Sequence, residues 1–72
     1  MDNSTELVIR ALIQGLYGSG AITSDHTRAV ISALKDAAGA AMDRHDPETA
    51  KHLIALCKGI RADNAIPLHE SA

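Results

Sequence analysis

The chain has 72 residues, a formal net charge of −2 at pH 7 and an apolar content of 46%, with Tyr17 as its single aromatic residue. This length allows one domain, and a chain so short buries only about 60% of the surface that its unfolded form exposes. The composition excludes a disordered chain, the charge excludes a strongly basic domain, and a single cysteine excludes an intrachain disulfide. The core must therefore come from leucine, isoleucine and thirteen alanines, and alanine has the highest helix propensity.

The first predicted helix covers residues 4–17. Asn3 with Glu6 three residues later predicts its N-cap, and the two glycines of Gly18-Ser19-Gly20 predict its end. The apolar face is wide, which predicts burial on more than one side, either within the fold or in an oligomer. Its larger apolar residues follow helical i, i+4 spacing in two neighbouring rows, one of Val8, Leu12 and Leu16 and one of Ile9 and Ile13.

The second predicted helix covers residues 24–44, with Thr23 or Ser24 as its cap. Its C-terminal half, from Ala37 to Ala41, contains only small residues. We expect a close helix–helix crossing there, because Gly39 in a helix interior costs about 1 kcal/mol relative to alanine and close packing would offset that cost. The apolar residues form two stripes, one of Val30, Leu34, Ala37 and Ala41 and one of Ile31, Ala38 and Met42.

The third predicted helix covers residues 47–61. Asp46 is a strong N-cap and Pro47 suits the first helical position. The short link before it predicts a hairpin with the second helix. We expect residues 62–72 to form an extended or disordered tail. One apolar stripe runs along the helix and consists of Ala50, Leu53, Ile54, Cys57 and Ile60.

These elements predict an all-α fold, a small three-helix bundle over residues 1–61 that packs in a homodimer. A chain of this size would struggle to cover so wide an apolar surface, and exposed apolar patches mark protein contacts. The residues predicted at the interface are Val8, Ile9, Leu12, Ile13, Leu16, Leu34, Ala38 and Ala41.

Two features invite a chemical interpretation. Glu48 and His52 are spaced i, i+4 and could share a metal ion, but a metal site needs three or four converging ligands, so we predict a solvated pair and no metal or cofactor. Cys57 lies late in an apolar stripe, where a thiol is inert filler. No nucleophile–base pair is evident, and so short a chain leaves little room for a substrate pocket; we therefore predict no enzyme activity.

The functional prediction is a small cytoplasmic interaction module that self-associates and acts as an adaptor, regulator or inhibitor of a larger protein. No apolar run is long enough to cross a membrane, and the acidic, polar first residues do not resemble a secretory signal. The alternative is a helical nucleic-acid-binding regulator that uses Lys51, Lys58 and Arg61. Its third helix has a net charge of only about +1 when Asp46 and Glu48 are included, which argues against several phosphate contacts.

Overall fold

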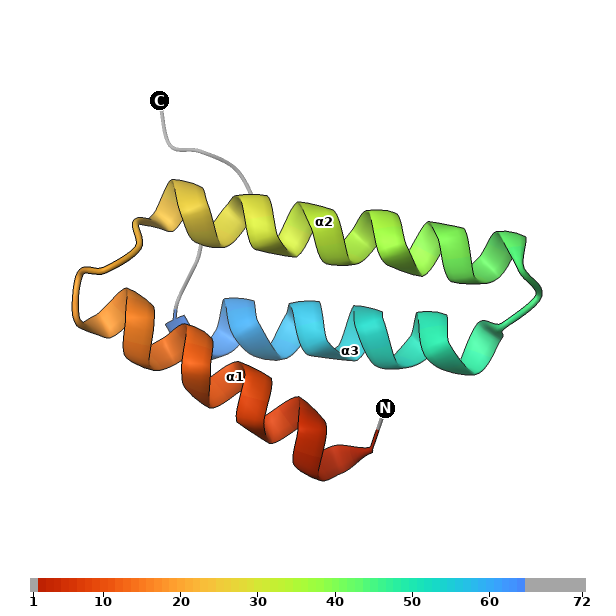
Figure 1. The fold of residues 1–72 in the computed structure, drawn as a ribbon, viewed down its shortest axis with the longest axis horizontal. Coiled ribbons are helices and arrows are strands. Elements are labelled where there is room, and N and C mark those ends of the chain that lie inside the picture. Colours follow the sequence, from red (N-terminus) through yellow and green to blue (C-terminus); the bar gives the residue numbers. More distant parts are fainter. Residues whose placement is uncertain (1, 65–72) are drawn as a thin grey trace.

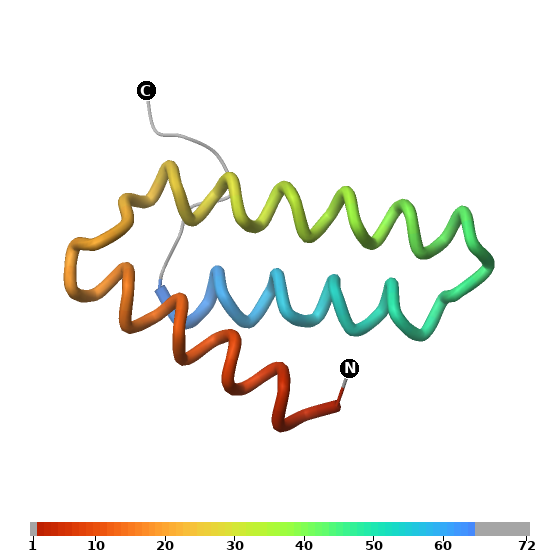
Figure 2. Tube along the Cα trace, viewed as in Figure 1, coloured from red at the N-terminus to blue at the C-terminus, as the bar shows by residue number. Residues whose placement is uncertain are grey.

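The computed structural model describes residues 2–64, which form α1 (Asn3–Gly18), α2 (Ser24–Asp43) and α3 (Pro47–Asn64). This part of the chain contains no strand, so the predicted all-α three-helix fold is confirmed. Helices α2 and α3 lie side by side as an antiparallel hairpin, and α1 crosses α3 obliquely, as the ribbon and the Cα trace both show (Figure 1, Figure 2). None of the three helices is long and apolar enough to cross a lipid bilayer.

The first helix begins one residue earlier than the sequence predicted. Asp2, in extended conformation, is the N-cap, and its carboxylate accepts a hydrogen bond from the Thr5 N–H at 2.7 Å. The prediction of Asn3 as the cap was therefore wrong, because Asn3 is already the first helical residue. An acidic cap also complements the positive end of the helix dipole.

The caps of the other two helices agree with the prediction. The Thr23 hydroxyl accepts from the His26 N–H at 3.2 Å, and His26 Nδ1 accepts in return from the Thr23 N–H at 3.1 Å. This is a capping box in which histidine takes the place of the usual Glu or Gln. At α3, the Asp46 carboxylate accepts from both the N–H and the hydroxyl of Thr49, at 3.2 and 2.7 Å.

Left-handed residues end the first two helices. Gly20, with φ 82°, turns the chain after α1, which confirms the predicted stop. After α2, His45 takes φ 59°, and the next residue, Asp46, donates its N–H to the Ala41 carbonyl at 2.9 Å. Only residues 44–46 link α2 to α3, so the predicted hairpin is confirmed.

The third helix is longer than predicted. It runs to Asn64, whose side-chain amide donates to the Ile60 carbonyl at 2.8 Å within the last turn. Residues 62–64, predicted as the start of a tail, are therefore helical. The rest of the predicted tail, residues 65–72, lies outside the described residues.

The larger of two core clusters joins all three helices. Ile60 and Leu56 are 0% and 1% exposed, whereas Ile54, which the sequence placed in the buried stripe, is 39% exposed. The other four residues of the predicted stripe are buried or partly buried, so only Ile54 was wrongly included and Leu56 was missed. The buried side of α3 is shifted in this way because α3 packs against both α2 and α1. The buried members are Ile31, Leu56, Cys57 and Ile60, and the partly buried residues around them are Ile9, Ile13, Tyr17 and Leu34.

The second cluster confirms the predicted close crossing of α2. Ala38 and Ala41 pack against Ala50 of α3, all three at 7% exposed or less, with Leu53 beside them. Gly39 does not take part, because a Cβ added there would have no atom within 4 Å. The alanines, and not the glycine, therefore allow the helices to approach.

A paired guanidinium and carboxylate join α1 to the end of α3. Arg10 donates from Nε and Nη2 to the two carboxylate oxygens of Asp63, at 2.8 and 2.7 Å. The Arg10 side chain passes over Gly59, where an added Cβ would lie 2.7 Å from Arg10 Nε. Gly59 therefore leaves room for the side chain that makes this bidentate contact.

The alanine crossing can be tested with Ala41→Leu. We expect the free energy of unfolding to fall by about 1–3 kcal/mol, because the larger side chain must be forced between α2 and α3. Ala40→Leu is the matched control: Ala40 is exposed, and there the change should stay within about 0.5 kcal/mol. Urea denaturation followed by circular dichroism measures both. Equal stability of the two variants would contradict the close crossing.

The two glycines inside α2 and α3 should respond differently to alanine. Gly39→Ala should raise the free energy of unfolding by about 0.5–1 kcal/mol, because it removes backbone freedom from the unfolded chain and meets no neighbour. Gly59→Ala should gain less or lose stability, because its Cβ displaces Arg10. Thermal denaturation of both variants checks the difference. The same gain at both positions would show that Arg10 moves aside freely.

The contact between Arg10 and Asp63 predicts a pH dependence of stability. Hydrogen bonds from Arg10 lower the pKa of Asp63, and partial desolvation opposes them. A lowered folded-state pKa stabilises the protein fully above the unfolded value of about 4, and the contribution is lost as the pH falls through the lowered pKa. Asp63→Asn should therefore flatten the fall in the free energy of unfolding below about pH 4. Urea titrations between about pH 2 and pH 6 measure the slope. If the exposed control Asp36→Asn flattened it as much, the assignment to Asp63 would be wrong.

Candidate functional site

The clearest candidate site is the side of α1 that faces away from the hairpin. Six uncharged residues lie there, all exposed, and we name them the outer face of α1: Leu7, Val8, Ala11, Leu12, Gly15 and Leu16. The four large side chains keep 44–61% of their surface accessible, with Leu12 the most exposed at 61%. Although α1 has sixteen residues, the described fold buries none of them fully.

The pattern of α1 separates two faces with different chemistry. Ile9, Ile13 and Tyr17 lie at i, i+4 spacing and pack against the core cluster that joins the helices. The two charged residues of the helix, Glu6 and Arg10, are partly buried near this inward side, and Arg10 is held by Asp63. The outer face therefore carries no charge and consists of aliphatic side chains around two small residues.

The structure divides the eight residues that the sequence placed at an interface. Val8, Leu12 and Leu16 lie on the outer face of α1. Ile9 and Ile13 turn inward. The remaining three also serve the interior of the chain: Leu34 packs against the larger core cluster, and Ala38 and Ala41 are buried in the α2–α3 crossing.

Two of the predicted interface residues are buried within the single chain, and one large, exposed apolar residue of α1 was not in the predicted set. Ala38 and Ala41 are 4% and 7% exposed, so α3 of the same chain already covers the side chains that had been assigned to a partner. Leu7 was not in the predicted set and is 53% exposed. Helical periodicity detects two apolar rows on α1, but it does not reveal which of them the hairpin covers.

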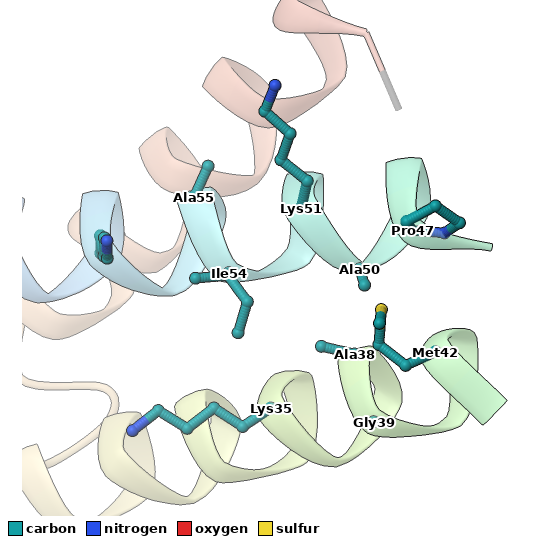
Figure 3. A pocket seen from close by; sticks show the side chains of 10 residues that line it. Lys35, Ala38, Gly39, Met42, Pro47, Ala50, Lys51, Ile54 and Ala55 are labelled. Atoms are coloured by element: carbon teal, nitrogen blue, oxygen red, sulfur yellow. The ribbon is translucent and has the colours of Figure 1, made fainter. Parts of the chain in front are cut away.

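A second surface is a shallow groove between α2 and α3. It has a volume of about 590 Å³, and all of its lining residues belong to these two helices (Figure 3). The floor is apolar, and the three lysines of the sequence all contribute to the lining. The residues are Lys35, Ala38, Gly39 and Met42 of α2 and Pro47, Ala50, Lys51, Ile54, Ala55 and Lys58 of α3.

The single cysteine lies in the core. Cys57 is 2% exposed, and its Sγ lies 3.6 Å from the Ile31 carbonyl oxygen. Burial raises the pKa of the Cys57 thiol, an effect that the charges of Lys35 and Arg61 only partly oppose. A buried and protonated thiol packs as a small apolar group and is a poor nucleophile.

The carboxylate and imidazole considered for metal binding form only a pair. His52 Nε2 lies 4.0 Å from a carboxylate oxygen of Glu48, and 40% of the His52 side chain and 79% of the Glu48 side chain are accessible to solvent. Within residues 2–64, no group of three histidine, cysteine or acidic side chains is arranged to hold a metal ion. The pair therefore has the geometry of a solvated contact along one helix.

Comparison with known proteins gives no significant match to a protein family, to a curated protein or to a solved structure. The functional argument therefore depends on the surfaces of the molecule itself.

Proposed function

We propose that this chain is a protein-interaction module that self-associates through the outer face of α1 and acts as an adaptor or regulator of a larger protein. The observation that carries the proposal is the exposure of Leu7, Val8, Leu12 and Leu16, at 44–61%, along one side of one helix. Scattered apolar residues are normal on a surface, but a contiguous apolar patch marks a site of association.

The chemistry of this face favours a second copy of the chain as its occupant. A partner must be apolar and must lack charges, since a charge buried opposite these side chains would lose its hydration without compensation. The outer face of α1 meets both conditions itself. Ala11 and Gly15, spaced i, i+4, leave room for a second helix backbone between the leucines. A two-fold axis would pair the two faces in a closed dimer, the commonest symmetric assembly.

The proposed role is binding and not catalysis. The buried Cys57 supports it, because the protein's single thiol is used in the core. The alternative role in nucleic-acid binding drew on Lys51, Lys58 and Arg61, but the two lysines share a groove lining that is mostly apolar and includes Ile54. Such a lining supports a protein partner better than a phosphate backbone.

Self-association can be tested with Leu12→Asp. Because Leu12 is 61% exposed in the single chain, the replacement should leave the fold intact and place a charge in the proposed contact. We expect the mass of the wild-type protein to approach twice that of the chain as concentration rises, and the variant to keep the monomer mass. Light scattering at several concentrations makes the measurement, with circular dichroism to verify helix content.

Ala33→Asp is the matched control, since it adds the same charge at an exposed position of α2 outside both surfaces. It should associate like the wild type. A wild-type mass that stays monomeric at all concentrations would contradict self-association. Equal weakening by both variants would assign the effect to net charge and not to the outer face of α1.

A further inference from the structure

The groove between α2 and α3 combines two properties that a simple surface depression lacks. Its floor is apolar, with Met42 and Ile54 still 56% and 39% exposed. Its lining contains Lys35, Lys51 and Lys58 and no carboxylate. Within residues 2–64, none of these three lysines forms an ion pair with an acidic side chain.

The distribution of basic residues makes this arrangement specific to the groove. The sequence has seven lysines and arginines against nine aspartates and glutamates, so the chain as a whole is acidic. All three lysines nevertheless line one groove. In the close-up, Ile54 points from α3 toward α2, Lys35 lies along α2, and the Lys51 side chain extends from α3 away from α2 (Figure 3). A locally positive, apolar site on an acidic molecule favours a ligand that has its own apolar surface and carries negative charge.

We infer that this groove binds an amphipathic helix of a partner protein, with acidic residues on both sides of its apolar face. Lys51 and Lys58 are seven residues apart on one side of α3, or about 10 Å along the helix axis, which matches two turns of a docked helix. The α3 wall runs from Pro47 to Lys58, so a helix of about three turns would fill it. Apolar side chains would cover Met42 and Ile54, and carboxylates would pair with the lysines.

The self-association surface proposed above, the outer face of α1, does not match the groove. The outer face of α1 is apolar, but it contains no acidic residue to pair with the three lysines. Helix α1 also contacts a different face of α3, at Gly59 and Asp63, and contributes no residue to the groove. The inference is therefore independent of self-association, and the two surfaces can be occupied together.

The test uses the full chain and two fluorescein-labelled peptides of eighteen residues, acetylated and amidated at their ends. Both carry leucines at i, i+3 and i+7 spacing, flanked by glutamates in one peptide and by lysines in the other. Fluorescence anisotropy at about 50 mM salt should show the glutamate peptide binding at least about tenfold more tightly than the lysine peptide. Equal affinity of the two peptides, or no binding of either, would overturn the inference.

Paired variants separate the groove from the net charge. Replacing Lys35, Lys51 and Lys58 with glutamine should weaken binding of the glutamate peptide by about two- to fivefold per lysine. The control carries Gln14→Glu, Ala29→Glu and Ala33→Glu, three exposed positions outside the groove, and so reaches the same net charge with the lysines in place. This control should bind the glutamate peptide with nearly the affinity of the wild type. Equal loss in both variants would reduce the effect to net charge and overturn the assignment.

Two further measurements test the apolar floor and the competing class of ligand. Ile54→Ser should weaken binding of the glutamate peptide by about fivefold, because it removes a large apolar contact at an already exposed position. A short DNA duplex that bound more tightly than the peptide, and displaced it, would overturn the inference in favour of nucleic acid. Repeating the titration with Leu12→Asp should give the same affinity, so failure of the groove and failure of self-association remain distinguishable.

Discussion

The close antiparallel contact between α2 and α3 is the constraint on which the other features depend. At the loop end of the hairpin the buried contact between the helices is made by the methyl groups of Ala38, Ala41 and Ala50, with Leu53 packed beside them. Small residues at this point bring α2 and α3 together without an aromatic core. The contact also leaves the neighbouring surface shallow, and the groove forms beside it.

The attachment of α1 is of a different kind. Its inward residues Ile9, Ile13 and Tyr17 are only partly buried, and the described fold buries no residue of this helix fully. Specific polar geometry supplements this packing, since Arg10 binds both oxygens of Asp63 across the space that Gly59 leaves open. The bidentate contact fixes the position at which α1 crosses α3. Its contribution to the free energy of unfolding is small, because both side chains are partly exposed to solvent.

Two surfaces with different chemistry follow from this arrangement. The outer face of α1 is apolar and uncharged, which suits a like surface, whereas the groove is apolar and positively charged, which suits an acidic one. They involve different helices, and α1 packs against α3 away from the groove lining. A dimer formed through α1 would therefore present two grooves, and a partner with two acidic helices would gain effective affinity from binding both.

The sequence by itself determined the local structure. Local signals depend only on residues close together in the sequence. They include the cap at Asp46 with Pro47, the helix stop at Gly20 and the spacing of apolar residues. These signals predicted the three helices, the hairpin link and the alanine crossing. Which apolar row is buried depends on contacts between distant segments. Only the tertiary structure turned Leu56 inward and Ile54 outward, assigned Ala38 and Ala41 to the interior, and brought Arg10 to Asp63 across 53 residues. It also brought Lys35 of α2 into the same groove lining as Lys51 and Lys58 of α3, because the register of the α2–α3 hairpin sets which parts of the two helices lie side by side.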